Sequence, residues 1–462
     1  MPHRIPALDR RSFLAASLAG LSGACSPAPR AQPPNVVLLL ADDMGYGDLA
    51  SYGCPDTATP HTDSIGAQGM RFSNFYANAP QCTPTRTALL TGRYQQRAGG
   101  LECAIGVGDV GRYDEAIWLA ERGELGLPSS ELTLGRIFQN RGYDTACFGK
   151  WHLGYRPQFS PNRHGFDEYF GILGGNADYF RHTEASGLNV LYHNSEPVQR
   201  EGYLTDLLID SAVEWLGRRR DNPFLLYLPF TAPHTPLQGP GDAGKIVTPE
   251  NWNKGDRATY VKMVESLDAG IGRVLAQLDT MGASDNTLVI FLSDNGGYNL
   301  SRNAPFRGQK SVLFEGGIRV PCMMRWPGVI PEGSESTQVG LTMDLLPTLL
   351  AAAGIAPPAN RTLDGIDLMP VVRGQRPPSA RTVFFRYKRG DVRQKAVLHG
   401  SMKYLWRNGR EDLFNIAADR HEDQDISTDF PGVVTELKDK LAEWEIEVRA
   451  PRLAGFRDGR ST

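Results

Sequence analysis

Four short apolar runs, each followed at once by polar or charged residues, constrain the fold of this chain more than any other feature. The runs lie at residues 35–40 (NVVLLL), 143–148 (YDTACF), 224–228 (FLLYL) and 287–292 (TLVIFL). Continuous apolar runs of this length are typical of buried strands. The residues that follow them include Asp42, Asp43, Lys150, His152, His234, Asp294 and Asn295. The sequence therefore predicts four strands that each end in polar side chains.

Stretches with helical periodicity separate these strands, at residues 132–140, 203–219 and 260–278. Alternating strands and helices favour an α/β fold in which a large, mostly parallel sheet lies between helices on both faces. In such sheets, ligands bind beyond the carboxyl ends of the strands. All four runs carry their polar residues at that end, so we expect one site there.

The pattern changes toward the C-terminus, after a stretch rich in Pro, Gly and Ser at residues 327–340. The elements expected there are a helix at 341–353, strands at 382–386, 394–398 and 402–406, a charged turn at 408–412, and an amphipathic helix at about 432–449. A chain of 462 residues suits one large domain plus a smaller one. We predict a catalytic domain at 32–375 and, at 376–462, a C-terminal subdomain made of an antiparallel sheet and a helix.

Residues 1–31 have the features of an export signal: Arg10 and Arg11, a short apolar run and then small residues. The arginine pair followed by Phe-Leu resembles a twin-arginine signal, which predicts use of the twin-arginine export machinery and a periplasmic location. The alternative is a tail with a chance arginine pair. Residues 21–25 resemble a lipoprotein cleavage site, but Leu21 is one residue too far from Cys25, so a lipid anchor is left open. We expect no transmembrane span in the mature chain.

The formal net charge of −3 provides no global basic field, so we expect no nucleic-acid partner. The cysteines are scattered and form no C-x-x-C pair, which makes a zinc knuckle or a dense disulfide framework a poor match. A disulfide between Cys54 and Cys103 is left open.

Two motifs at the ends of predicted strands carry oxygen ligands, Asp42-Asp43 and Asp294-Asn295. Three carboxylates repel one another unless a cation gathers them. A hard divalent ion fits, and Ca²⁺ fits better than zinc because no His or Cys accompanies the cluster in these motifs. The alternative is that these are ordinary turn-forming residues after strands.

The segment Cys82-Thr83-Pro84-Thr85-Arg86 predicts a helix that begins near Cys82 and ends at Gly92. Backbone N–H groups and the helix dipole at such a start favour an anion and should lower the pKa of the Cys82 thiol. Arg86, one turn further on, offers a planar fork for a tetrahedral oxyanion. The alternative is a buried structural cysteine in a helix cap.

Lys150, His152, His234 and Lys310 are each unremarkable alone, since a lysine in a loop is usually solvated and a histidine between prolines is usually a turn residue. The first three follow predicted strands at the end that holds the metal motifs. Lys310 follows the strand that ends in Asp294 and Asn295. We therefore expect all four at the same site.

Together these motifs resemble those of type I sulfatases, within the alkaline phosphatase superfamily. The resemblance rests on C-x-P-x-R at 82–86 followed by LTGR at 90–93, GKWHLG at 149–154 and SDNGG at 293–297. It spans about residues 35 to 425 and implies an alkaline phosphatase-like fold. It also implies hydrolysis of sulfate esters of sulfated carbohydrates or of aryl compounds. The segments 165–171 and 178–180 resemble arylsulfatase B-like and glycosaminoglycan sulfatases, which favours a sulfated sugar.

The resemblance further implies that a formylglycine-generating enzyme oxidises Cys82 to formylglycine. The hydrated aldehyde would attack sulfur, and its second hydroxyl would then expel sulfate. The residues implied in this chemistry are Asp42, Asp43, Asp294 and Asn295 for Ca²⁺, Arg86 and Lys150 for the diol and sulfate oxygens, His152 as base, and His234 and Lys310 for sulfate and the leaving oxygen. Segments 155–200 and 235–257 are expected to line the outer pocket. Because the twin-arginine route moves folded proteins, oxidation should precede export.

Three alternatives remain at this point. One is a phosphoester or phosphonate hydrolase of the same superfamily. Another is a non-catalytic protein that binds sulfated glycans without turnover and keeps Cys82 unmodified. The third is a Cys/His acyl-transfer hydrolase that uses the Cys82 thiolate and needs no calcium.

Overall fold

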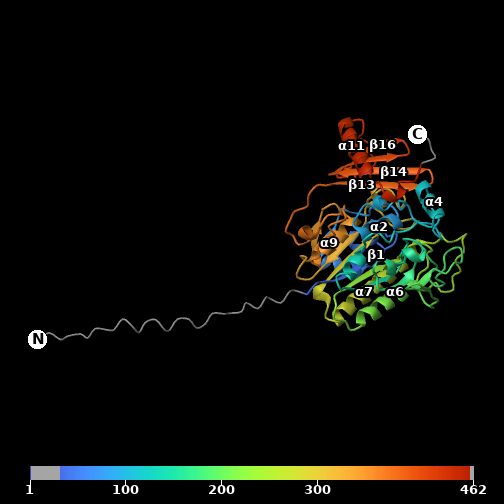
Figure 1. The fold of residues 1–462 in the computed structure, drawn as a ribbon, viewed down its shortest axis with the longest axis vertical. Helices are drawn as coiled ribbons and strands as arrows, with labels where there is room; N and C mark the ends of the chain where they lie inside the picture. Colours follow the sequence, from blue (N-terminus) through green and yellow to red (C-terminus); the bar gives the residue numbers. More distant parts are fainter. Residues whose placement is uncertain (2–31, 458–462) are drawn as a thin grey trace. The chain divides into compact units, whose positions relative to one another are not determined.

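A ten-stranded mixed sheet forms the centre of the protein (Figure 1). The structure is a computed structural model that describes residue 1 and residues 32–457. In spatial order the strands are β11 (Ser334–Ser336), β2 (Met70–Phe72), β10 (Cys322–Arg325), β9 (Thr287–Ser293), β1 (Asn35–Ala41), β8 (Phe224–Pro229), β4 (Asp144–Phe148), β5 (Glu168–Ile172), β6 (Leu191–His193) and β7 (Glu196–Pro197). The five strands from β9 to β5 are parallel. Both the α/β class and the parallel centre predicted from the sequence are confirmed.

Helices cover the two faces of this sheet. The α-helices of the described residues are α1 (Pro60–Ala67), α2 (Cys82–Thr91), α3 (Gln95–Ala98), α4 (Asp114–Glu121), α5 (Leu134–Gln139), α6 (Leu204–Gly217), α7 (Arg257–Thr280), α8 (Glu315–Ile318), α9 (Leu345–Ala352), α10 (Met369–Val372) and α11 (Pro431–Glu447), of which α11 lies against a second, smaller sheet. Figure 1 shows β1 between α2 and the pair α6–α7.

Alternate side chains of β1 belong to two different hydrophobic cores. Val36, Leu38 and Leu40 pack in one core with residues of α2, and Val37 and Leu39 pack in the other core with residues of α6 and α7. A strand that is buried on both faces needs apolar residues at every position, which explains the continuous run at 35–40.

A four-stranded antiparallel sheet with order β13-β14-β15-β16 follows in the chain. Its strands are β13 (Thr382–Arg389), β14 (Val392–His399), β15 (Met402–Arg407) and β16 (Arg410–Asn415). Helix α11 covers it, with the rings of Trp444 and Phe384 stacked 5.2 Å apart. The smaller sheet with a covering helix is confirmed, whereas the domain boundary at 375/376 stays a prediction.

The charged turn expected at 408–412 is shorter than predicted, because Arg410–Asp412 belong to β16. The turn consists of Asn408 and Gly409, whose φ angles are 45° and 94°. Two positive φ values are the signature of a type I′ hairpin turn, which Asn-Gly favours. The charged residues that follow therefore extend the hairpin.

The helix expected at 341–353 is also shorter. Gly340–Leu341 form β12, which pairs with β3 (Phe75–Tyr76), and a short 3₁₀ turn precedes α9. The backbone N–H of Leu341 donates to a carboxylate oxygen of Asp344 at 2.7 Å, which holds Leu341 extended and delays the helix.

The five cysteines among the described residues are all unpaired, so the disulfide left open for Cys54 and Cys103 does not form. The Cys54 thiol lies 3.1 Å from an Asp56 carboxylate oxygen, and the Cys103 thiol lies 3.4 Å from the Gln81 side-chain oxygen. The twin-arginine signal and Cys25 lie outside the described residues. A search of the described helices finds none with the length and apolar character to cross a bilayer.

Candidate active site

The carboxyl ends of the central parallel strands meet at one edge of the sheet and bring the predicted residues together. Asp42 and Asp43 follow β1, and Asp294 and Asn295 follow β9. These two pairs become neighbours because β1 and β9 align Ala41 with Ser293. His234 follows β8, and Lys150 and His152 follow β4.

Two residues at this edge have backbones in the left-handed region. Asp43 has a φ of 60° and His152 a φ of 55°. This region is sparsely populated by residues other than glycine, and such strain gathers at functional sites.

Cys82 is the first residue of α2 and lies at the floor of the site. Gln81 precedes it in an extended conformation, and Gly92 ends the helix in the left-handed region. The side chain of Cys82 is 1% exposed. Its Sγ lies 3.5 Å from Asp42 Oδ1 and 3.5 Å from Lys310 Nζ. The start of α2 therefore places the Cys82 thiol between a carboxylate, Asp42, and an ammonium group, Lys310.

The expectation of a lowered thiol pKa at Cys82 is wrong for this structure. Burial, together with the Asp294 charge, raises the pKa of Cys82 to about 12, although Lys150 and Lys310 oppose the rise. Desolvation of a thiolate thus outweighs the attraction of the two lysines. Cys82 is therefore a neutral thiol here.

Arg86 connects two of the strand ends. Its Nε and Nη2 both donate to Asp294 Oδ2, at 3.0 and 2.8 Å, and its Nη1 donates to the backbone oxygen of Lys150 at 2.7 Å. The guanidinium is fully buried. A planar fork with several donors is what this arrangement requires, and a lysine could not reproduce it.

Asp42 forms an ion pair with Lys150, which follows β4. Lys150 Nζ donates to Asp42 Oδ2 at 2.6 Å, and neither side chain is exposed. Burial and the neighbouring Asp294 charge nevertheless raise the pKa of Asp42 to about 7.

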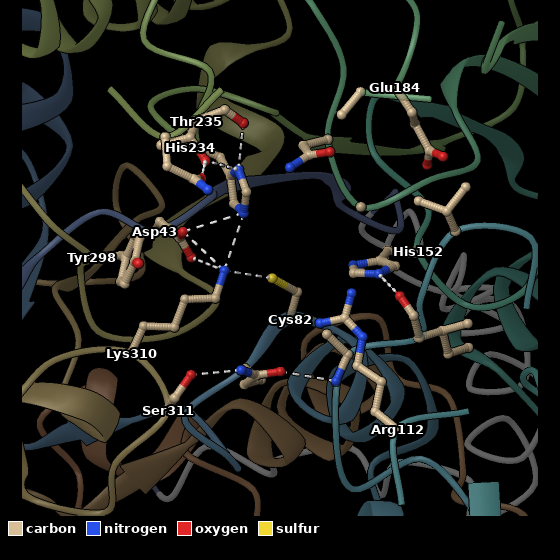
Figure 2. A pocket seen from close by; sticks show the side chains of 18 of the residues that line it. Asp43, Cys82, Arg112, His152, Glu184, His234, Thr235, Tyr298, Lys310 and Ser311 are labelled. Atoms are coloured by element: carbon tan, nitrogen blue, oxygen red, sulfur yellow. Dashed lines mark hydrogen bonds and ion pairs between the residues drawn. The ribbon is translucent and has the colours of Figure 1, made fainter. Parts of the chain in front are cut away.

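Asp43, His234 and Lys310 form a second cluster (Figure 2). Lys310 Nζ lies 2.7 Å from Asp43 Oδ1 and 3.1 Å from His234 Nε2. Burial opposes the charged form of Asp43, but Lys310 and His234 outweigh it and hold the pKa of Asp43 well below its usual range. Asp43 and Lys310 are therefore both charged.

The hydrogen bonds of the two histidines determine which ring nitrogen carries the proton. His152 Nε2 lies 2.9 Å from the Ile105 backbone oxygen, and His234 Nδ1 lies 2.7 Å from that of Thr235. A carbonyl oxygen only accepts, so these nitrogens are protonated and His152 Nδ1 and His234 Nε2 carry lone pairs.

Both rings are neutral at pH 7, because burial lowers the pKa of His152 well below its usual value and that of His234 to about 3. His152 Nδ1 is buried and has no hydrogen-bond partner within residues 32–457. The lone pair of that nitrogen is therefore free to accept a proton or a hydrogen bond.

The donor set fits a hard cation. Asn295 Oδ1 is buried and has no donor among the described side chains and backbone, while its Nδ2 donates to Asp43 Oδ1 at 2.8 Å. An unsatisfied amide oxygen beside carboxylates is a natural calcium ligand. One correction is needed, because Cys82 and His234 do accompany the cluster: their potential ligand atoms and those of Asp42 and Asp43 all lie within 4.8 Å of one another.

A pocket of about 380 Å³ opens above Cys82. Its outer wall includes Tyr155, Gly175, Asn176, Glu184 and Ala185 from the segment 155–200, and Thr235, Trp252 and Asn253 from the segment 235–257. Both segments thus lie where the sequence placed them. The pocket also includes Arg112 and Arg389, which sequence reasoning missed because neither lies in a motif or at a strand end.

Comparison with known proteins points to one family. The model of the family described as sulfatase matches residues 34–355, and a model described as N-sulphoglucosamine sulphohydrolase, C-terminal, matches residues 308–447. N-acetylgalactosamine-6-sulfatase of Canis lupus familiaris is 36% identical over 427 residues, which cover 87% of this chain and 77% of that protein. Arylsulfatase A of Homo sapiens is 34% identical over 408 residues, which cover 81% of this chain and 73% of that protein.

Solved structures agree in fold. A crystal structure of Ps i-CgsB in complex with k-i-k-neocarrahexaose has a TM-score of 0.80 at 33% identity, covering 91% of this chain and 94% of that chain. The phosphonate monoester hydrolase of Agrobacterium radiobacter has a TM-score of 0.64 at 21% identity, covering 90% and 96%. The second likeness is one of fold alone.

Proposed function

Since this chain belongs to the sulfatase family and is a sulfuric ester hydrolase, we propose that it hydrolyses sulfate esters of sulfated sugars through a formylglycine made from Cys82. The observation that carries the proposal is the position of Cys82 Sγ, 3.5 Å from both Asp42 Oδ1 and Lys310 Nζ at the first residue of α2. Sγ stands where an oxygen of the hydrated aldehyde would lie. A neutral, buried thiol is a poor nucleophile, whereas a hydrated aldehyde needs no thiolate.

The surrounding residues divide the proton transfers between two sides of Cys82. Lys310 carries its proton at Nζ, and we propose that it gives this proton to the oxygen that leaves with the sugar as the sulfur–oxygen bond breaks. The Asp42 carboxylate, whose Oδ1 lies 3.5 Å from Cys82 Sγ, would accept the proton of the hydroxyl that attacks sulfur. His234, neutral with Nε2 directed at Lys310, orients that ammonium. His152 Nδ1, whose lone pair is free, would accept the proton of the second hydroxyl, which forms the aldehyde carbonyl as the carbon–oxygen bond to sulfate breaks.

We also propose that Asp42, Asp43, Asp294 and Asn295 hold Ca²⁺. When bound, the ion would supply positive charge close to the sulfuryl oxygens and so stabilise the charge that develops there. Arg86 and Lys150 support this arrangement by fixing Asp294 and Asp42. The unsatisfied Asn295 Oδ1 favours calcium over a purely structural role for this cluster.

A sugar substrate suits the pocket better than a small aryl sulfate. About 380 Å³ accommodates a monosaccharide unit with part of a neighbour, and the wall carries charged and amide side chains beside the aromatic Tyr155, Trp252 and Tyr298. The similarity to an N-acetylgalactosamine-6-sulfatase supports the same choice.

Maturation should precede folding. Cys82 is 1% exposed and is the first residue of the buried helix α2, so an enzyme that reads C-x-P-x-R must reach it in an unfolded chain. We propose that a formylglycine-generating enzyme acts in the cytoplasm and that the twin-arginine machinery then exports the folded protein to the periplasm, with or without a lipid at Cys25.

Two measurements test the proposal. Mass spectrometry of the tryptic peptide Phe72–Arg86 should find the aldehyde at position 82, and kinetics on matched sulfate and phosphate esters should favour sulfate. Unmodified Cys82 in a protein that binds but does not cleave sulfated sugars would favour the glycan-binding alternative. A preference for phosphorus would favour the phosphoester or phosphonate alternative. Cys82 as an acyl-transfer thiolate is disfavoured by its raised pKa and by the bond of His152 to Ile105.

A further inference from the structure

The wall of the pocket beyond Cys82 carries a cation without a counter-ion. Arg112 is partly buried and lines the pocket, but within residues 32–457 no hydrogen bond or ion pair engages its guanidinium. Arg86, in the same region, is in contrast fully paired with Asp294 and the Lys150 backbone. Partial burial of an unpaired charge is unfavourable, so Arg112 is a ready site for an anion.

Glu184 supplies a second unsatisfied group in the same pocket. It is 2% exposed, and the Tyr155 hydroxyl donates to its Oε1. Its Oε2 is buried and has no donor in the described part of the chain. A Cβ at Gly174 would lie 2.1 Å from Oε1, so only glycine leaves room for this carboxylate. The loop therefore accommodates an acceptor that the protein itself does not use.

Arg112 and Glu184 lie on the same side of the site. In the view of Figure 2 they flank His152, whereas Asp43, His234 and Lys310 lie on the other side of Cys82. The two groups differ in what they can bind. A guanidinium binds an oxyanion through two parallel N–H donors, and a carboxylate repels an anion but accepts from a hydroxyl or amide N–H.

We propose that Arg112 and Glu184 form a second substrate subsite, which takes a sugar that carries another oxyanion besides the sulfate to be cleaved. Arg112 binds that oxyanion, and Glu184 accepts a hydrogen bond from a neutral hydroxyl or amide of the same ligand. The proposal rests on the proposed function, and it narrows the substrate class to multiply anionic glycans. The second oxyanion is a sulfate or a carboxylate, which share the geometry that a guanidinium recognises.

Four substrates distinguish whether the second oxyanion is a sulfate or a carboxylate. They are 4-methylumbelliferyl sulfate, a monosulfated hexosamine, the same hexosamine with a second sulfate, and a disaccharide of the monosulfated hexosamine with a uronic acid. For Arg112→Ala we expect kcat/KM to fall by about 10- to 100-fold on one or both of the last two substrates, with little change on the first two. The substrate that loses more identifies the oxyanion as sulfate or carboxylate.

Two further variants control for charge and folding. Arg112→Lys keeps the charge and should lose less than Arg112→Ala on the same substrates. Arg200→Ala removes an exposed arginine that does not line the pocket and should leave all four values unchanged. Glu184→Gln keeps a partner for Tyr155 and should lower kcat/KM about tenfold on the sugars and not on the aryl sulfate.

Equal losses on all four substrates, or no loss in Arg112→Ala, would overturn the inference while leaving the proposed function intact. If the unaltered protein cleaved none of the sulfate esters, the proposed function would fail first and the subsite with it.

Discussion

The ammonium of Lys403 and the carboxylate of Glu315 form an ion pair that is completely removed from solvent, with Nζ 2.8 Å from Oε1. Lys403 lies on β15 of the C-terminal sheet, and Glu315 begins α8, just after the segment that contains Lys310. Glu422 Oε1 lies 2.9 Å from the same Nζ, and the Tyr76 hydroxyl donates to Glu315 Oε2 at 2.8 Å. These buried contacts thus hold the C-terminal sheet against the segment that contains Lys310 and Glu315.

We expect Lys403→Met to destabilise the protein strongly. Removing Lys403 leaves the carboxylates of Glu315 and Glu422 buried with Arg319 as the remaining cation, 3.1 Å from Glu315 Oε2. Loss of one partner of a buried pair typically reduces the free energy of unfolding by about 3–5 kcal/mol. The measurement is the urea midpoint or the Tm of the purified variant. Lys438→Met is the matched control, because its pair with Glu411 is largely exposed and should contribute less than about 1 kcal/mol. Equal effects of the two substitutions would contradict the prediction.

Glu102 should make stability depend on pH in the acid range. Burial alone would raise its pKa, but Arg386 and Lys388 outweigh burial and hold the pKa of Glu102 at about 2. A lowered pKa gives stability that is present above the unfolded value of 4.5 and is lost as the pH falls toward about 2. The free energy of unfolding of Glu102→Gln should therefore lie up to about 3 kcal/mol below that of the parent at pH 7.

The difference in the free energy of unfolding between the parent and Glu102→Gln should vanish as the pH falls from 4.5 toward about 2. Chemical denaturation at several pH values measures this difference. Glu121→Gln, at an exposed position, should show no such trend. A constant difference at every pH would mean that the pairing of Glu102 with Arg386 does not stabilise the fold.

Much of the fold could be predicted because continuous apolar strands are specified locally. The runs at 35–40 and 287–292 became β1 and β9 with almost the predicted bounds. Their parallel alignment then brought Asp42 beside Asp294 without any further information. The position of Cys82 followed in the same way from Pro84 and Gly92, which mark one helix.

Features that depend on contacts between distant segments could not be predicted. The raised pKa of Cys82 results from burial and from Asp294, which lies more than 200 residues away in the sequence. Arg112 and Glu184 have ordinary sequence surroundings. Only the folded pocket shows that the Arg112 guanidinium and Glu184 Oε2 lack partners among the described residues. The hairpin at Asn408-Gly409 could have been recognised, since this dipeptide favours a two-residue turn.

Arg86→Lys should impair activity despite keeping the charge. A lysine cannot donate to Asp294 Oδ2 twice and also reach the Lys150 backbone, so both strand ends lose a fixed position. We expect kcat to fall by about 100-fold, of the order seen when one preorganised donor is removed from an active site. Arg93→Lys is the control, because Arg93 pairs with Glu131 away from the pocket. Parental kcat in Arg86→Lys would show that the fork is dispensable.

Calcium should stabilise the protein against heat. A ligand that binds only the folded state adds about 2.7 kcal/mol at a hundred times its Kd, so the Tm should rise with CaCl₂ concentration. Asn295→Ala removes the unsatisfied Oδ1 and should shift this rise to higher calcium concentration. Mg²⁺ prefers to keep several waters and is the control ion. Identical curves for the two proteins would exclude Asn295 as a calcium ligand, and identical curves for the two ions would exclude a site that prefers Ca²⁺.

Cys82→Ser should stop after one turnover. A serine hydroxyl at this position can attack sulfur and release the alcohol, but it has no second hydroxyl on the same carbon to expel the sulfate. The variant should therefore release at most one equivalent of alcohol and retain a sulfate ester on the peptide 72–86, which mass spectrometry detects. Cys82→Ala has no hydroxyl and should neither release alcohol nor gain mass. Continuous turnover by Cys82→Ser would mean that the second oxygen of a hydrated aldehyde is not needed, and the mechanism built on Cys82 would have to be replaced.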